Sequence, residues 1–113
     1  PPIAHESTSQ TGLGHLDGTL SMARGAAGTA ASEFFICIGA QPGLDAGAHR
    51  NADGLGFAAF GRVVKGMDVV RNIHGQPSAA ATEVAYVAGQ IMEQPVGITT
   101  IRRAQRPVEM PAQ

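Results

Sequence analysis

The sequence has few of the residues that mark the commonest specialised sites. Among its 113 residues there is one cysteine, Cys37, one lysine and no tryptophan. A single cysteine excludes an intramolecular disulfide and a cysteine–histidine metal cluster. Because Cys37 lies in an apolar run, we expect a buried small side chain there, in preference to a nucleophile.

Charge of one sign and long apolar runs are also lacking. The net charge is −1, and the eight basic residues are scattered, so nothing favours DNA, RNA or an anionic membrane as a partner. No apolar run is long enough to span a membrane. The four histidines lie far apart without the spacing of metal ligands, so we expect no metal site built on them. These histidines are His5, His15, His49 and His74.

The start of the chain does not indicate a cellular compartment. It begins at Pro1-Pro2 without methionine, and we expect that a beginning has been lost. The missing signal peptide therefore does not distinguish bacterial cytoplasm from periplasm.

The most informative stretch is 32–39, which is rich in bulky and β-branched residues and ends in glycine. It predicts a strand. Side chains alternate along a strand, so Phe34, Ile36 and Ile38 share one face and Glu33, Phe35 and Cys37 share the other. A carboxylate beside an aromatic indicates an apolar pocket with a polar rim. The alternative is a core strand with Glu33 at a solvated edge.

The rest of the chain predicts a loop-rich single domain, since it contains 15 glycines and 7 prolines. In chain order we expect an extended loop over 1–17, strands over 18–23 and 57–64, a helix over 66–75, a closing strand over 95–103 and a tail over 104–113. Gly61, inside the second of these strands, indicates either a bulge or a close backbone approach. Segment 82–92 fits either a helix or irregular structure.

Two short motifs fail on inspection. Asn51-Ala52-Asp53-Gly54 begins like a calcium loop, but Arg62 stands where the closing carboxylate is needed. Gly54-Leu55-Gly56 and Gly12-Leu13-Gly14 both lack the downstream glycine of a dinucleotide-binding loop. These residues are therefore expected to form ordinary turns.

The order of several motifs resembles that of the cyclophilins. The segments that carry the resemblance are Gly18-Thr19-Leu20-Ser21-Met22-Ala23, Gly28-Thr29-Ala30-Ala31-Ser32-Glu33-Phe34-Phe35-Ile36, Leu44-Asp45, Phe60-Gly61-Arg62-Val63-Val64 and Gly66-Met67-Asp68-Val69-Val70. The match is specific from Gly18 to about Ile73 and weaker over 98–103. The loop before Phe57 is similar to that of bacterial members.

This resemblance implies a mainly β fold, an antiparallel β-barrel with one or two short helices, and peptidyl-prolyl cis-trans isomerase activity that assists protein folding. No cofactor is implied. The family's catalytic arginine, beside a Phe-Met-x-Gln segment, precedes the matched part, and 1–17 contains no equivalent. We therefore expect a partial domain over 1–113, an incomplete barrel without its N-terminal strands, and no catalytic residue in this chain.

The resemblance also assigns a substrate-binding pocket for the proline ring. Phe35 matches its aromatic floor, Leu44 its aliphatic wall and Phe57 its rim, where many members have a histidine. Gly43 falls where some eukaryotic members have tryptophan, so that ring's contact is expected to be missing.

Three further positions match the part that binds the substrate main chain. Ala23 and Arg24 match a segment whose backbone pairs with the peptide, and Arg24 stands where asparagine is common. Glu33 replaces a common glutamine, which keeps an acceptor and loses a donor. We do not expect Arg24 to replace the catalytic arginine.

Three hypotheses follow. The first is an isomerase acting on proline-containing peptides or unfolded chains, with part of the pocket in this chain. The second is a module that binds such peptides without catalysis, and the third is an inactive scaffold fragment. Open sheet edges would favour self-association in the third case.

Overall fold

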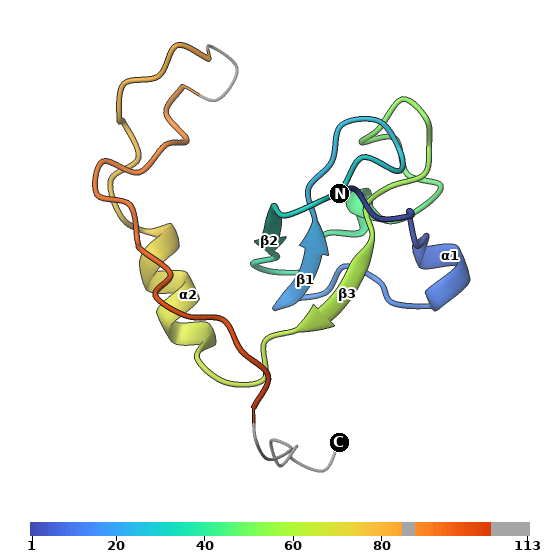
Figure 1. Cartoon of the computed structure of the whole chain (residues 1–113), viewed down its shortest axis with the longest axis horizontal. Coiled ribbons are helices and arrows are strands. Elements are labelled where there is room, and N and C mark those ends of the chain that lie inside the picture. Colours follow the sequence, from blue (N-terminus) through green and yellow to red (C-terminus); the bar gives the residue numbers. More distant parts are fainter. Residues whose placement is uncertain (85–87, 105–113) are drawn as a thin grey trace. The chain divides into compact units, whose positions relative to one another are not determined.

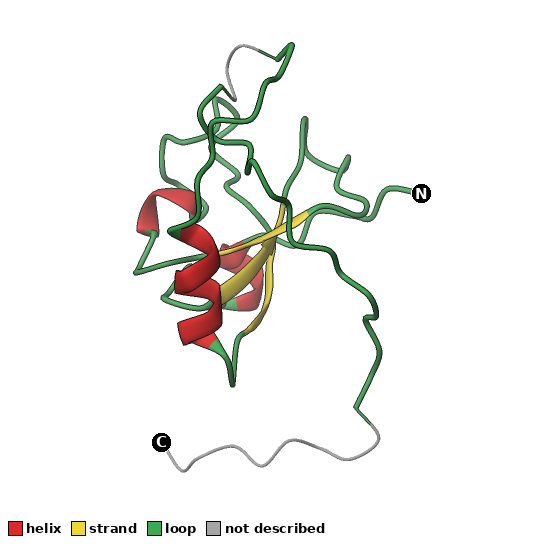
Figure 2. Cartoon of the chain, turned by 90° about the vertical axis from the view of Figure 1, so that its left-hand side faces the viewer, coloured by secondary structure: helices red, strands yellow, loops and turns green. Residues whose placement is uncertain are grey.

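The computed structural model describes residues 1–84 and 88–104. Its internal contacts divide the chain into two compact units, Pro1–Met67 and Asp68–Gln113, which are described separately. Figure 1 labels the elements, and Figure 2 shows that loops connect them over most of the chain. The elements are α1 (Thr8–Thr11), β1 (Thr19–Met22), β2 (Phe34–Ile36), η1 (Pro42–Leu44, a 3₁₀-helix), β3 (Ala59–Arg62) and α2 (Met67–His74).

The first unit contains a three-stranded antiparallel sheet in the order β2-β1-β3. Between β1 and β3 the register shifts: Leu20 pairs with Gly61, whereas Ser21 pairs with Ala59. Phe60 is therefore an extra residue in β3, which is the definition of a β-bulge. The bulge, one of the two predicted alternatives, is confirmed and lies beside Gly61.

The two faces of this sheet differ sharply in polarity. Ser21 is opposite Phe35 in β2, and it is 0% exposed. The residues on the other face of the β1–β2 pair are apolar: Leu20 pairs with Ile36 and Met22 pairs with Phe34. Phe34 is 40% exposed. The predicted alternation of Phe34 and Phe35 between faces is thus confirmed, and the site described below lies on the Ser21 face.

The buried residues of this unit are small or polar. Its buried apolar side chains are Ala30, Cys37, Ala58 and Ala59, whereas the largest fully buried side chains are those of His15 and Ser21. The prediction that Cys37 is buried is confirmed. Because alanines bury little apolar area, the hydrogen bonds of the buried polar groups carry more of the local specificity than usual.

Residues 1–17 are not extended throughout, as the sequence had led us to expect. They contain the short helix α1, which begins after Ser7 in a capping box. The Ser7 side chain accepts from the Ser9 N–H, and the Gln10 side chain bonds back to the Ser7 N–H. The Ser-x-x-Gln spacing was the available signal. The predicted strands are shorter than expected, covering four, three and four residues.

The second unit contains most of α2 and little other regular structure. The helix predicted over 66–75 is confirmed as Met67–His74, with Asp68 in its first turn and the Gly75 N–H bonded to the Arg71 carbonyl. The closing strand predicted over 95–103 was wrong, because no strand occurs there. Strand formation needs a partner strand, and the nearby pairing is one isolated bridge between Ala79 and Ile91.

The fold is mainly β, with few and short helices, as predicted. A closed barrel does not occur within the described residues, since the three strands form an open sheet. Segment 82–92 is irregular where it is described; residues 85–87 and most of the predicted tail, 105–113, lie outside the described residues. In the described ranges, no helix is both long and apolar enough to cross a membrane.

Candidate functional site

Two aromatic rings form the centre of the candidate site. The rings of Phe35 and Phe57 are perpendicular, with centroids 5.6 Å apart, an arrangement that aromatic pairs favour. Both residues are only partly buried. The Phe57 N–H donates to the Leu44 carbonyl over 2.9 Å. The fold therefore brings together all three residues predicted for the proline pocket, from β2, from η1 and from the segment before β3.

Arg24 lies against this pair with its side chain only 2% exposed. Its guanidinium carbon is 5.5 Å from the centroid of the Phe57 ring, within the range of a cation–π contact. An arginine has five N–H donors, and five hydrogen bonds leave this one. They go to the Gly56 carbonyl (3.0 and 2.6 Å), the Gly25 carbonyl (2.9 Å) and the two Asp53 carboxylate oxygens (3.0 and 3.1 Å).

These bonds have an electrostatic consequence for Asp53. Its hydrogen bond with Arg24, assisted by the Leu55 backbone N–H, holds the pKa of the Asp53 carboxyl below its usual value. The carboxylate is thus charged throughout the neutral range and offsets the charge of the sealed guanidinium. With every N–H donor used, Arg24 has none left for a substrate. The expectation that Arg24 does not replace a catalytic arginine agrees with this geometry.

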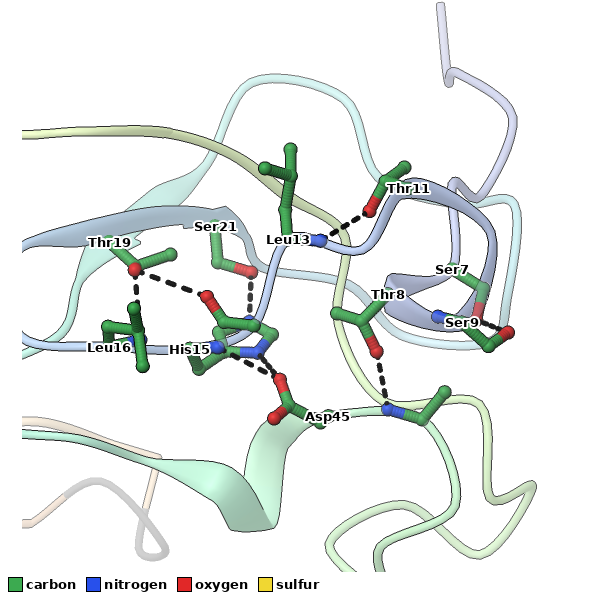
Figure 3. A network of polar contacts seen from close by, with 12 residues as sticks. Ser7, Thr8, Ser9, Thr11, Leu13, His15, Leu16, Thr19, Ser21 and Asp45 are labelled. Carbon is green, nitrogen blue, oxygen red and sulfur yellow. Dashed lines mark hydrogen bonds and ion pairs between the residues drawn. The ribbon is translucent and has the colours of Figure 1, made fainter.

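A second polar network, drawn in Figure 3, is centred on His15. His15 is 1% exposed, and its two ring nitrogens have different partners. Nδ1 is 2.6 Å from Asp45 Oδ1 and Nε2 is 2.8 Å from Ser21 Oγ. The same Asp45 oxygen accepts from the His15 backbone N–H at 2.9 Å. Because a carboxylate only accepts, Nδ1–H donates to Asp45, and in the neutral ring Nε2 accepts from the Ser21 hydroxyl.

This Asp–His–Ser order matches the connectivity that activates a serine nucleophile in hydrolases. Here Ser21 is 0% exposed in the middle of β1, so an acyl group has no route to its oxygen. The network is therefore a structural support. It also reaches the aromatic pair, because the His15 ring stacks on Phe35 at 6.3 Å between centroids and an interplanar angle of 10°.

Comparisons with known proteins identify the family of this chain. The family model described as cyclophilin type peptidyl-prolyl cis-trans isomerase/CLD matches residues 1–103. The chain belongs to the cyclophilin family. It is 43% identical over 74 residues to peptidyl-prolyl cis-trans isomerase A of Dickeya dadantii, covering 65% of this chain and 36% of the relative. It is 35% identical over 102 residues to a peptidyl-prolyl cis-trans isomerase of Acinetobacter baylyi, covering 89% and 49%. The chain thus spans half or less of the length of these relatives.

The remaining positions assigned from the cyclophilin resemblance lie at the edge of the site. The Ala23 N–H donates to the Glu33 carbonyl over 2.9 Å, extending the β1–β2 pairing beyond the strand ends. That N–H is therefore already paired within the chain. Glu33 itself is exposed. Its predicted role in substrate positioning stays a prediction, as does the main-chain role of Ala23 and Arg24.

Sequence reasoning missed four residues that the structure places at or beside the candidate site. His15 had been dismissed for lacking metal-ligand spacing, and Asp53 was examined only as part of a failed calcium loop. Asp45 and Ser21 were noticed only as parts of family motifs. One signal was available: Ser21 alternates with the apolar Leu20 and Met22 in β1, which places a polar residue on the inner face, where it needs a partner.

Cys37 was predicted on the face that lines the pocket. Burial raises the pKa of its thiol, and the charges of Asp45 and Asp17 act in the same direction. A protonated, 3% exposed thiol is a poor nucleophile. Within the described residues, no three His, Cys, Asp or Glu side chains are grouped as a metal site would require.

Proposed function

We propose that this chain supplies the proline-binding pocket of a peptidyl-prolyl cis-trans isomerase that acts on proline-containing peptides or unfolded protein chains. The observation that carries the proposal is the perpendicular Phe35–Phe57 pair joined to Leu44. Partly exposed rings of this kind offer a flat apolar surface that suits a pyrrolidine ring. Family membership and the names of the two relatives support it.

The physical requirement is modest. Rotation about an X–Pro bond has a barrier of about 20 kcal/mol because the amide C–N bond is partly double. Catalysis requires tighter binding of the twisted amide than of either planar form. A pocket that grips the proline ring fixes one side of the bond, while the main chain of 23–24 is proposed to hold the other. No covalent intermediate is involved.

Binding without catalysis is the second candidate, and one observation favours it for this chain alone. Arg24, the arginine in contact with the aromatic pair, has used all five N–H donors on protein acceptors. It therefore cannot hydrogen-bond the prolyl nitrogen to weaken its conjugation.

A single experiment separates these candidates. An Ala-Pro peptide is titrated into the chain, and into any longer product of the same gene, while NMR exchange spectroscopy follows its cis–trans interconversion. Binding with faster exchange supports the isomerase, and binding with unchanged exchange supports the module. Phe35→Ala is expected to weaken binding about tenfold or more, since it removes the pocket floor. A wild-type chain and longer product that both leave the peptide unchanged would contradict both candidates.

We further propose that the three strands are part of the cyclophilin barrel, with β2 and β3 as its open edges in this chain. Phe34 and Phe60, 40% and 50% exposed, lie on these two edge strands. Unpaired edges with exposed apolar side chains favour self-association. Sedimentation velocity is expected to show oligomers that grow with concentration, whereas a monomer at all concentrations would argue against open edges.

A further inference from the structure

Arg24 is unusual because a charged side chain is sealed in a part of the chain that is otherwise well exposed. Its side chain is 2% exposed, while the neighbouring residues 25–29 are all exposed. Removing a guanidinium from water is costly unless its charge and all its donors are matched. Here Asp53 supplies the charge, and two backbone carbonyls complete the hydrogen bonds. Because its charge and all its N–H donors have partners, the guanidinium is held in one position.

In this position the Arg24 side chain connects two segments that are far apart in the sequence. Arg24 follows β1, whereas Asp53 and Gly56 belong to the loop that leads to Phe57 and β3. The backbone of this loop is also held independently of Arg24, since the Phe57 N–H bonds to the Leu44 carbonyl. The guanidinium therefore adds a contact with the Phe57 side chain itself, since its central carbon is 5.5 Å from the centroid of the ring.

We propose that Arg24 is a positioning residue, whose sealed guanidinium, tied to Asp53 and to the Gly56 carbonyl, holds the Phe57 ring perpendicular to Phe35 and so sets the rim of the prolyl pocket. This inference rests on the proposed function in one respect, namely that the pocket binds a proline ring. The ring of Phe57 is restrained by Arg24 on one side and by Phe35 on another, which limits its rotation before a ligand arrives. Such preorganisation lowers the entropic cost of binding.

The four phenylalanines of the chain provide a direct test. Fluorophenylalanine labelling is expected to give four ¹⁹F resonances, which single Phe→Leu variants assign. In Arg24→Met, which keeps an unbranched apolar stem but removes the charge and the guanidinium fork, the Phe57 and Phe35 resonances should shift and broaden. Those of Phe34 and Phe60 should stay in place and thereby report an intact sheet. The matched control is Arg50→Met, an exposed arginine in the same loop, which should move none of them.

A second variant keeps the test decisive if Arg24→Met unfolds. Arg24→Lys preserves the charge but not the five-donor fork, so we expect a smaller movement of the same two resonances. Unchanged Phe57 and Phe35 resonances in a folded Arg24→Met or Arg24→Lys chain would overturn the proposal. So would equal shifts of all four rings, because they would mean general loosening.

Titration with the Ala-Pro peptide then separates this inference from the proposed function. Loss of the cation–π contact should weaken peptide binding about three- to thirtyfold in Arg24→Met and leave it unchanged in Arg50→Met. If the wild-type chain binds no peptide while the two rings still move, the positioning of Phe57 stands and the proposed function fails. If the peptide binds equally well to wild type and Arg24→Met, the positioning role for the pocket is overturned.

Discussion

The loop between β2 and β3 is attached to the sheet region at two aspartates, and the two attachments work differently. Asp45 bonds to a histidine that is fully buried and that also bonds to Ser21 in β1. Asp53 bonds to an arginine that is sealed by the loop itself, while the carboxylate is 36% exposed. We call the buried Asp45–His15 contact the inner attachment and the partly exposed Asp53–Arg24 contact the outer attachment.

This difference indicates which attachment stabilises the fold and which one determines the geometry of the candidate site. At the inner attachment, losing His15 leaves the Ser21 hydroxyl buried without this hydrogen bond, a cost that water cannot relieve. At Asp53, water and salt reach the carboxylate and replace part of what is lost. We therefore expect changes at the inner attachment to affect stability and changes at the outer attachment to affect mainly the geometry around Phe57.

The largest expected effect comes from a change that disturbs both attachments. Gly56 has φ of +67°, and a Cβ there would lie 2.5 Å from the Leu44 carbonyl oxygen and 2.6 Å from the Asp45 carbonyl carbon. Gly56→Ala is expected to destabilise the chain by about 3–4 kcal/mol, combining left-handed strain with backbone overlap. Urea unfolding followed by circular dichroism measures it. Gly43→Ala, with no atoms within 4 Å of its Cβ, is the control and should stay within about 0.5 kcal/mol.

The next effect is the loss of the inner attachment. His15→Ala leaves the Ser21 hydroxyl and the Asp45 carboxylate without their ring partner and creates a cavity, so we expect a loss of about 2–3 kcal/mol in unfolding free energy. Ser21→Ala removes only the hydroxyl end of this network and keeps the His15–Asp45 bond, so it should cost about 1 kcal/mol. The same urea titrations test both. Equal losses for the two variants would mean that the Asp45 bond contributes nothing.

The outer attachment should make the stability of the chain depend on pH. Because the folded state holds the pKa of Asp53 below its unfolded value, Asp53 contributes stability above the unfolded pKa of about 3.9. This contribution is lost as the pH falls through the lower, folded pKa. Wild type and Asp53→Asn should therefore differ in stability by a constant amount from pH 5 to 7 and converge below pH 4. A constant difference down to pH 2 would contradict the Arg24–Asp53 pairing.

The smallest effect concerns the reactivity of Cys37, which can report on both attachments. Its buried thiol, with a raised pKa, should react slowly with iodoacetamide in the folded chain and quickly in urea. His15→Ala should speed this alkylation, because it removes the inner attachment close to β2, which Cys37 directly follows, whereas Asp53→Asn should leave it unchanged at pH 7. Faster labelling in Asp53→Asn would mean that the outer attachment also supports the core.

Local signals predicted the helix, the central strand and the faces of its side chains, whereas the pocket roles of Leu44 and Phe57 came only from the cyclophilin resemblance. The helix Met67–His74 followed from apolar spacing and the flanking Gly75, and the separation of Phe34 from Phe35 followed from strand alternation. The closing strand over 95–103 failed, because a β-rich composition does not supply a partner strand. The short helix at Thr8–Thr11 was missed because one turn is too short to show apolar periodicity.

By itself, the sequence determined the family to which the chain belongs, since the order of its motifs is that of the cyclophilins, and the apolar positions of the candidate site followed from that resemblance. Only the tertiary structure decided that His15 joins Asp45 to Ser21 and that Arg24 is closed off by Asp53 and Gly56. These partners are 6 to 32 residues apart. A hydrogen bond at that separation depends on how loops approach one another, which no local pattern of side chains encodes.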